Sequence, residues 1–340
     1  MTIIFRCNAS SVVGVGHLVR CCALAYILKQ QGETCIMVGP DNFYKNNQYQ
    51  EIFTEWIPVN NWKSSQEDSA ALIYIAKKNE ASLLVLDDYR VDENYQLSIR
   101  KAGLKWLQFS NPKNKAIWAD MYIDPNPGAH VEDYKALVHN ENTQLLLGPT
   151  YAILRSEFLK IKKKPTPNNT KQVLVSFGGG DDHGGIEFVL STLLPVTPDN
   201  LRFVVVSGLI NPNNNQLKEW INVNGRERVD LHINPQEVAK LFLACDIAVI
   251  SGGTTTYEVD CCGLPFIIIS NADNQVEQSQ AWDSSGKAKY LGNLDSVNKD
   301  LFISTFKKLL NSNHIYLRNK TQTSYDGSYK VANLIINNNC

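Results

Sequence analysis

The fold is decided near the start of the chain, where residues 2–39 read TIIFRCNASSVVGVGHLVRCCALAYILKQQGETCIMVG. The apolar runs at 3–7 and 34–39 have the length of buried strands, and residues 17–32 carry apolar side chains at helical spacing. Gly32 follows the helical pattern where a C-cap glycine is expected. The stretch therefore predicts a strand, a helix and a second strand, which is the repeating unit of a parallel α/β sheet.

The same alternation of strands and helices is predicted both before and after residues 160–171. This segment, KIKKKPTPNNTK, is basic and contains two prolines. We interpret this segment as a linker between domains. The predicted organisation is an N-terminal Rossmann-like domain at 1–159, the linker at 160–171, and a C-terminal Rossmann-like domain at 172–340. The predicted fold class is α/β, with two parallel sheets that face each other across a cleft. Ligands are expected in that cleft, at the carboxyl ends of the strands.

The composition excludes several classes of protein. Lys and Arg number 33 against 34 Asp and Glu, so the net charge of −1 gives no basic field for a nucleic-acid partner. The longest apolar run, at 265–270, is far shorter than the roughly 20 residues that span a bilayer, and the first residues lack the pattern of a signal peptide. None of the eight cysteines forms a CxxC pair. We expect a cytoplasmic monomer without a membrane span, a metal or a cofactor.

The first candidate site is the glycine-rich turn at 14–17, GVGH, which opens the first helix. Gly14 and Gly16 fit a dinucleotide fingerprint, but the third glycine is replaced by Val19, which argues against NAD. His17 stands at the helix start instead, with Arg20 one turn later. The positive end of the helix dipole disfavours an imidazolium, and a neutral imidazole is the form that a general base needs. The alternative is a histidine that only packs in the turn.

Two further glycine-rich turns follow strands in the second half. In VSFGGGDDHGG (175–185), Gly178 and Gly179 would let a ligand approach the backbone, although a flexible loop has the same composition. In VISGGTTTYEVD (249–260), a strand ends and threonines open a helix, an arrangement suited to a pyrophosphate. The residues expected to surround that anion are Ser251, Gly252, Gly253, Thr254 and Thr255. The alternative is an ordinary capped helix in the core.

Three other side chains complete the predicted nucleotide-sugar site. Glu258 lies one helical turn after Thr254, where its carboxylate can accept hydrogen bonds from ribose hydroxyls. Asn274 and Gln275 follow the next strand, and their amides suit sugar hydroxyls and acetamido groups. The turn lacks the GK[ST] of a P-loop, which favours a nucleoside diphosphate over ATP. A polar helix start is the alternative for the two amides.

These motifs together resemble one known family. FRCNASSVVGVGHLVRCCALA (5–25) resembles the N-terminal signature of the PseG family, the UDP-2,4-diacetamido-2,4,6-trideoxy-β-L-altropyranose hydrolases of pseudaminic acid biosynthesis. The resemblance continues through LDDYRVD (86–92), DPNPGA (124–129), LLLGPTYAILRSEF (145–158), VSFGGGDD (175–182), ISGGTTTYE (250–258) and SNADNQ (270–275). It covers nearly the whole chain in the expected order.

The resemblance implies a GT-B fold similar to that of MurG, with the nucleotide held by the C-terminal domain. It implies a hydrolase that cleaves the anomeric C–O bond of a UDP-sugar with inversion, His17 as the base, and a substrate site that Tyr89, Glu258 and Asn274 line. One position departs, because Asn8 stands where the family usually has Asp. An amide can hold the geometry of the histidine or the water but cannot stabilise an imidazolium. Reduced activity, a related substrate, a glycosyltransferase and a non-catalytic nucleotide-sugar-binding protein stay open as alternatives.

Overall fold

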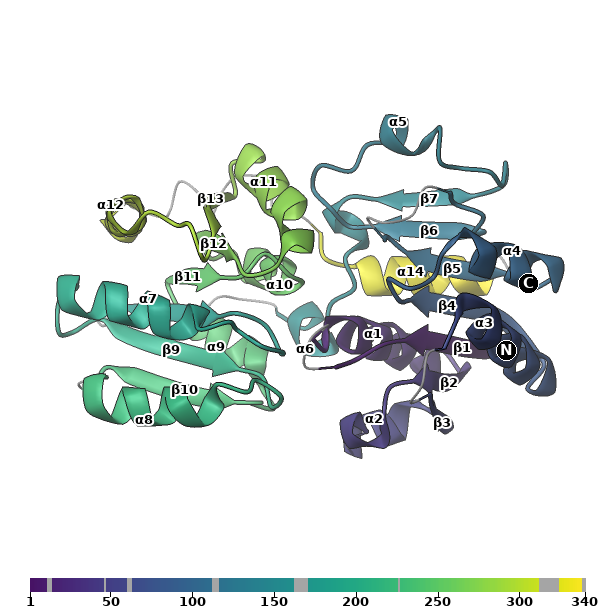
Figure 1. Cartoon of the computed structure of the whole chain (residues 1–340), viewed down its shortest axis with the longest axis horizontal. Coiled ribbons are helices and arrows are strands. Elements are labelled where there is room, and N and C mark those ends of the chain that lie inside the picture. Colours follow the sequence, from purple (N-terminus) through teal and green to yellow (C-terminus); the bar gives the residue numbers. More distant parts are fainter. Residues whose placement is uncertain are drawn as a thin grey trace. The chain divides into compact units, whose positions relative to one another are not determined.

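The structure is a computed structural model that describes residues 1–10, 14–45, 47–59, 63–111, 116–161, 171–225, 227–311 and 324–337. The chain divides into two compact units. The first unit comprises Met1–Ser10, His17–Ser156 and Ser324–Cys340, and the second comprises Ser11–Gly16 and Glu157–Thr323. Each unit is built on its own parallel sheet (Figure 1).

The first unit contains a seven-stranded parallel sheet in the order β3-β2-β1-β4-β5-β6-β7. Its strands are β1 (Thr2–Cys7), β2 (Thr34–Gly39), β3 (Glu55–Pro58), β4 (Ala81–Asp87), β5 (Trp106–Phe109), β6 (Met121–Asp124) and β7 (Gln144–Leu147). The helices assigned to this half are α1 (Gly16–Gln30), α2 (Asn47–Ile52), α3 (Ser65–Lys78), α4 (Glu93–Lys101), α5 (Val131–Tyr134) and α14 (Gly327–Asn337), with short 3-10 turns η1 (Asn42–Tyr44) and η2 (Pro149–Tyr151). The central strands β1, β2 and β4 are almost continuously buried, as expected for strands covered on both faces.

A buried ion pair in the first unit joins Arg6 of β1 to Asp68 of α3. The guanidinium of Arg6 is 1% exposed and donates two hydrogen bonds to the carboxylate of Asp68, at 3.1 and 2.9 Å. The same carboxylate accepts a hydrogen bond of 2.8 Å from the hydroxyl of Tyr95. Burial alone would lower the pKa of Arg6, but Asp68 outweighs it through hydrogen bonding and charge, so the pKa is raised. This network fixes α3 and α4 to β1.

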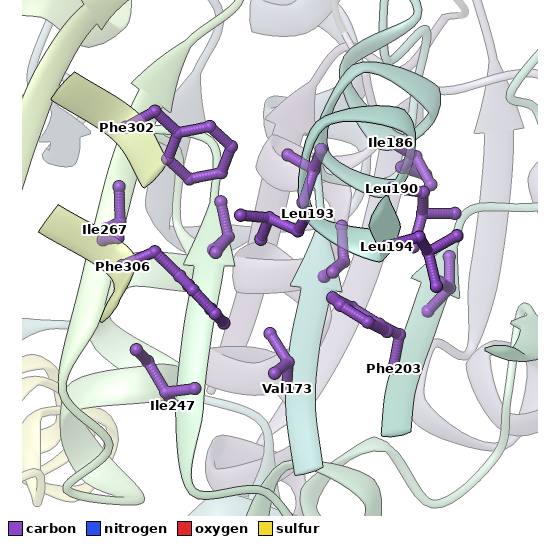
Figure 2. Packing of buried hydrophobic residues seen from close by; sticks show 14 of the residues in the cluster. Val173, Ile186, Leu190, Leu193, Leu194, Phe203, Ile247, Ile267, Phe302 and Phe306 are labelled. Carbon is purple, nitrogen blue, oxygen red and sulfur yellow. The ribbon is translucent and has the colours of Figure 1, made fainter. Parts of the chain in front are cut away.

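The second unit contains a six-stranded parallel sheet in the order β10-β9-β8-β11-β12-β13. Its strands are β8 (Gln172–Ser176), β9 (Arg202–Ser207), β10 (Val229–Ile233), β11 (Ile247–Ile250), β12 (Phe266–Ser270) and β13 (Ala288–Asn293). Its helices are α6 (Ser156–Leu159), α7 (Gly185–Leu193), α8 (Asn214–Asn224), α9 (Val238–Ala244), α10 (Thr255–Cys261), α11 (Val276–Ser284) and α12 (Lys299–Asn311), with 3-10 turns η3 (Leu194–Val196) and η4 (Asp273–Gln275). Figure 2 shows Leu193 of α7 and Phe302 and Phe306 of α12 packed over strand residues Val173 and Ile247.

The predicted α/β organisation is confirmed, and the strand predicted at 34–39 has those bounds in the structure. No strand was predicted from the sequence at β3, β7, β10 or β13, which are the edge strands of the two sheets. Edge strands are half exposed, so they lack the uninterrupted apolar runs that mark central strands. Most of the predicted linker, residues 162–170, lies outside the described residues.

The predicted boundary at 172–340 differs from the structure at the C-terminal end. Helix α14 belongs to the first unit (Figure 1). The side-chain amide of Gln31, directly after α1, donates a hydrogen bond of 2.9 Å to Oδ1 of Asn333. The hydroxyl of Ser328 forms hydrogen bonds of 3.1 Å with the backbone N–H and the carbonyl of Leu154. A helical pattern shows which face of a helix is apolar but not which sheet that face covers.

Candidate active site

In the first sheet, β1 lies between β2 and β4, and the strand order reverses between β1 and β4. Ligands of open α/β sheets bind at such a switch point. Asn8 directly follows β1, and Tyr89 lies two residues after the end of β4. His17 is the second residue of α1, the helix that follows β1. The structure thus places Asn8, His17 and Tyr89 at the carboxyl ends of the two central strands.

The ring of His17 is held by two neighbours. Its Nδ1 lies 2.7 Å from Oδ1 of Asp87 and 2.9 Å from the backbone oxygen of the same residue. The ring of Tyr89 meets it edge to face, with centroids 4.6 Å apart and an angle of 86° between the planes. His17 is 6% exposed. A ring in these contacts has a defined orientation, which a general base requires.

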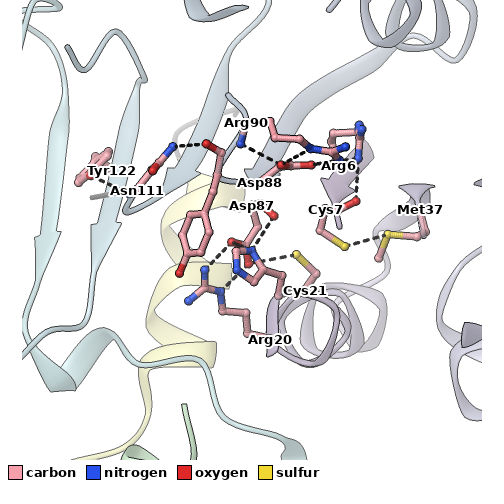
Figure 3. Close-up of polar contacts among 12 residues, drawn as sticks. Arg6, Cys7, Arg20, Cys21, Met37, Asp87, Asp88, Arg90, Asn111 and Tyr122 are labelled. Carbon is pink, nitrogen blue, oxygen red and sulfur yellow. Dashed lines mark hydrogen bonds and ion pairs between the residues drawn. The ribbon is translucent and has the colours of Figure 1, made fainter. Parts of the chain in front are cut away.

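Asp87 contacts both His17 and Arg20 and was not predicted from the sequence as a site residue. Its carboxylate is 1% exposed and also pairs with the guanidinium of Arg20 through both oxygens (Figure 3). Burial alone would raise the pKa of Asp87, but the charge of Arg20, together with hydrogen bonds from Arg20 and His17, outweighs it, so the pKa lies well below its usual range. Asp87 therefore remains a carboxylate at neutral pH. The sequence signal that could have indicated Asp87 is its position at the end of β4, the strand next to β1 in the sheet.

Arg20 was predicted to bind substrate, and in the structure its guanidinium contacts Asp87 and Phe109. It pairs with Asp87 and lies over the ring of Phe109, 4.5 Å from the ring centroid. Its side chain is 13% exposed. The carboxylate that contacts His17 belongs to Asp87, at the end of β4, and not to the position that Asn8 occupies after β1. The substitution of Asn8 for the family's Asp thus leaves the histidine with an anionic partner.

The second sheet has its switch point at β8, which lies between β9 and β11. Gly178 and Gly179 follow β8, and Ser251 follows β11. Gly178 has a φ of 91°, and a Cβ built on it would lie 3.9 Å from Oγ of Ser251, so the two glycine-rich turns are neighbours. The structure therefore brings the GGG and GGTTT turns together at the carboxyl edge of this sheet.

The residues before His17 pack within the second unit. A Cβ on Gly16 would lie 3.6 Å from Oγ1 of Thr254, and a Cβ on Gly179 would overlap the side chain of Val15 at 2.3 Å. Gly14 has a φ of 79°, a backbone conformation that favours glycine. Gly14 and Gly16, the two glycines of the predicted first site, thus belong to the second unit, together with the glycine-rich turns. His17 belongs to the first unit.

Two glutamines brace the turn after β11. Oε1 of Gln275 accepts hydrogen bonds from the backbone N–H of Gly252, at 3.0 Å, and of Asn271, at 3.2 Å. Nε2 of Gln278 donates to the carbonyls of Gly252 and Gly253, at 2.8 and 3.2 Å. Gln275 was predicted to contact the sugar, and Gln278 was not singled out. Both side chains hold the backbone of the turn.

The other predicted residues of this half lie nearby. Thr255 is the first residue of α10, and Glu258 is in the same helix and is 8% exposed. Thr254 directly precedes that helix. Asn274 lies in η4 and is exposed. The structure places all of them after β11 or β12, the neighbouring strands whose ends carry the turn.

Gly252 and Gly253 should respond differently to alanine. A Cβ on Gly252 would lie 2.2 Å from Oγ of Ser279 and 2.9 Å from Cβ of Gln275, whereas a Cβ on Gly253 meets no described atom within 4 Å. We expect Gly252→Ala to lower the free energy of unfolding by about 1–3 kcal/mol, the usual cost of overpacking. Gly253→Ala should cost less than about 1 kcal/mol. Urea denaturation measures both losses, and equal destabilisation by the two variants would contradict this division.

No group of three or more potential metal ligands occurs in the parts of the chain that the structure describes. Over the same residues, no helix combines the length and apolar character that crossing a membrane requires.

The fold and the two switch-point sites define a class of protein with two Rossmann-like domains, built on parallel sheets of seven and six strands. A solved structure of the same GT-B class is MurG of Acinetobacter baumannii, with a TM-score of 0.64 at 12% identity over 99% of this chain and 100% of that one. This similarity concerns the fold alone. The predicted α/β fold class, with two Rossmann-like domains built on parallel sheets, is confirmed.

Sequence comparison leads to more particular relatives, although no family model matches the chain. The chain is 25% identical over 283 residues to the UDP-2,4-diacetamido-2,4,6-trideoxy-β-L-altropyranose hydrolase of Campylobacter jejuni, covering 83% of this chain and 96% of the relative. It is 25% identical to the spore coat polysaccharide biosynthesis protein SpsG of Bacillus subtilis, over 88% and 86% of the two chains. An uncharacterised protein of Methanocaldococcus jannaschii is 26% identical over 82% of this chain, which spans 57% of that relative's length. The predicted resemblance is confirmed.

Proposed function

We propose that the protein hydrolyses a UDP-linked 2,4-diacetamido-2,4,6-trideoxy sugar, releasing UDP and the free sugar in the biosynthesis of pseudaminic acid or a related nonulosonic acid. The observation that carries this proposal is a histidine whose Nδ1 is held by a buried carboxylate at the switch point of the first sheet. The similarity to the C. jejuni hydrolase over 83% of the chain supports the substrate class.

In the proposed reaction, Nε2 of His17 takes a proton from a water molecule as the water oxygen bonds to the anomeric carbon. The bond between that carbon and the β-phosphate oxygen breaks, its electron pair leaves with UDP, and the configuration inverts. Such reactions pass through an oxocarbenium-like transition state. UDP is a good leaving group and needs little protonation, so a base on the water and charge stabilisation at the diphosphate suffice.

The second unit is proposed to hold the nucleotide. The glycine-rich turns after β8 and β11 would receive the diphosphate on their backbone N–H groups, and Glu258 would receive the ribose. The residues assigned to substrate are Asn8, Gly14, Gly16, Tyr89, Gly178, Gly179, Ser251, Gly253, Thr254, Thr255, Glu258 and Asn274. Gly252 and Gln275 would act by shaping the turn, as their contacts with each other indicate. No metal or cofactor takes part in the proposed reaction.

A glycosyltransferase is the second candidate, because a glycosyltransferase of Rickettsia africae is among the solved structures with a similar fold, at a TM-score of 0.63 and 13% identity. The two functions differ in what happens when the donor is offered alone. We expect incubation with a UDP-diacetamido sugar, without any acceptor, to release UDP and free sugar stoichiometrically over many turnovers. A donor that stays intact until a hydroxylated acceptor is added would contradict hydrolysis and identify a transferase.

A further inference from the structure

The carboxylate of Asp87 lies between two cationic or basic side chains, His17 and Arg20, at the end of β4. We propose that Asp87 and Arg20 are positioning residues that act on His17 as a pair. Asp87 fixes the ring with its proton on Nδ1, and Arg20 prevents the same carboxylate from holding a second proton on the ring. The place of this pair in catalysis rests on the proposed function, but its effect on the ring does not.

The hydrogen bonds determine which nitrogen carries the proton. Nδ1 of His17 faces two acceptors, Oδ1 of Asp87 at 2.7 Å and the backbone oxygen of Asp87 at 2.9 Å. A nitrogen between two acceptors must donate, so the neutral ring carries its hydrogen on Nδ1 and leaves the lone pair on Nε2. The edge-to-face contact with Tyr89 restricts rotation of the ring. Nε2 is therefore the atom that can accept a proton.

Arg20 changes the net charge that Asp87 presents to the ring. A buried carboxylate beside a histidine ordinarily stabilises the imidazolium. Here the guanidinium of Arg20 pairs with both oxygens of Asp87, so the carboxylate is already neutralised. The three side chains sum to zero charge with a neutral ring and to +1 with a protonated ring. A base that must begin neutral benefits from this arrangement.

The other titratable groups at this cluster carry no opposing charge. Tyr89 presents its ring to His17, and the thiol of Cys21 lies 3.8 Å from Oδ2 of Asp87. Burial raises the pKa of the Cys21 thiol well above its usual value, so it stays protonated. Among the described neighbours of the ring, Asp87 and Arg20 are the charged groups whose contacts define its surroundings.

The contacts of Arg20 suit it to hold the carboxylate of Asp87 rather than to bind a substrate phosphate. Its Nε and Nη2 are engaged by Asp87, and its guanidinium plane is covered by the ring of Phe109 at 4.5 Å. Bidentate pairing of this kind fixes geometry as well as charge. Lysine offers a single cationic nitrogen and cannot reproduce the fork.

The position of the proton can be measured on the full-length protein without substrate. Protein labelled with ¹⁵N-histidine gives long-range ¹H–¹⁵N spectra that distinguish the two ring nitrogens, and the spectrum of His17→Ala assigns the signals of His17. We expect the neutral ring to carry its hydrogen on Nδ1. A hydrogen on Nε2 would overturn the proposal, whatever reaction the protein catalyses.

Two variants should move the titration midpoint of the His17 signals in opposite directions. Arg20→Met leaves the carboxylate to His17 alone and should raise the midpoint by about one pH unit, whereas Asp87→Asn leaves the cation and should lower it by a similar amount. Arg20→Lys keeps the charge and should shift the midpoint less than Arg20→Met. Shifts in the same direction, or none, would overturn the proposal, and the tautomer of the unmodified protein remains decisive if a variant fails to fold.

The link to catalysis is tested separately. With a UDP-diacetamido sugar, the acid limb of the kcat/KM profile should follow the midpoints of the ring, and Asp87→Asn should lower kcat with little change in KM. A purely structural residue would not move that limb. If the ring titrates as expected but the protein releases no UDP, the proposed hydrolysis is wrong, and the effect of Asp87 and Arg20 on the His17 ring is still supported. If the acid limb ignores the ring, the catalytic role of the pair is wrong.

Discussion

His17→Ala is expected to lower the rate of UDP release about 10²- to 10⁴-fold, the range that a general base contributes. The variant removes the only ring that Asp87 and Tyr89 orient at the carboxyl ends of β1 and β4 among the described residues. UDP affinity should be unchanged, because the nucleotide is assigned to the glycine-rich turns of the second unit. Steady-state kinetics and calorimetric titration with UDP measure the two quantities.

His232→Ala is the matched control for this experiment. His232 lies on the edge strand β10 of the other sheet and belongs to no candidate site. We expect its kinetics to equal those of the unmodified protein. If His17→Ala retained full UDP release, the histidine would not be the base. If the unmodified protein released no UDP and both variants still bound it, the protein would be a nucleotide-sugar-binding protein instead.

Asp68→Ala is expected to lower the free energy of unfolding by about 3–5 kcal/mol, a larger loss than that expected for Gly252→Ala. The change leaves the guanidinium of Arg6, which is 1% exposed, without the carboxylate that accepts two of its hydrogen bonds. It also removes the acceptor of the Tyr95 hydroxyl. Urea denaturation measures the loss.

The neighbouring residue supplies a control in the same helix. The side chain of Glu67 is 64% exposed and pairs with Lys63 across 4.0 Å. An exposed ion pair contributes at most about 1 kcal/mol, so Glu67→Ala should change the urea midpoint little. Similar losses from the two variants would show that burial does not set the strength of the Arg6–Asp68 pair.

The two sheets and the place of His17 at the start of a helix could be predicted from the sequence, because both depend on local patterns. Apolar runs mark the central strands, and His17 lies directly after the GVG turn. The pairing of His17 with Asp87 depends on β1 and β4 being neighbours in the sheet, which separates the partners by 70 residues in the chain. No pattern of local spacing reports such a contact.

The LDD sequence at the end of β4 illustrates the same limit. Asp87 pairs with Arg20, whereas Asp88 pairs with Arg90 and approaches Arg6 at 3.5 Å (Figure 3). Successive residues of a strand point to opposite faces, so only the register of β4 shows which aspartate meets the histidine. Gly252 and Gly253 are equally indistinguishable in sequence, since the difference between them is the packing of α11 against one of the two.

The central claim, attack of water at the anomeric carbon, is tested most directly by mass spectrometry of the products formed in ¹⁸O-labelled water from a UDP-diacetamido sugar. We predict that the label enters the sugar and that the released UDP carries none. UDP is the decisive product, because its phosphate oxygens do not exchange with water, whereas the anomeric oxygen of a free sugar does so slowly. One ¹⁸O atom in the UDP would show attack at phosphorus and would contradict the mechanism assigned to His17.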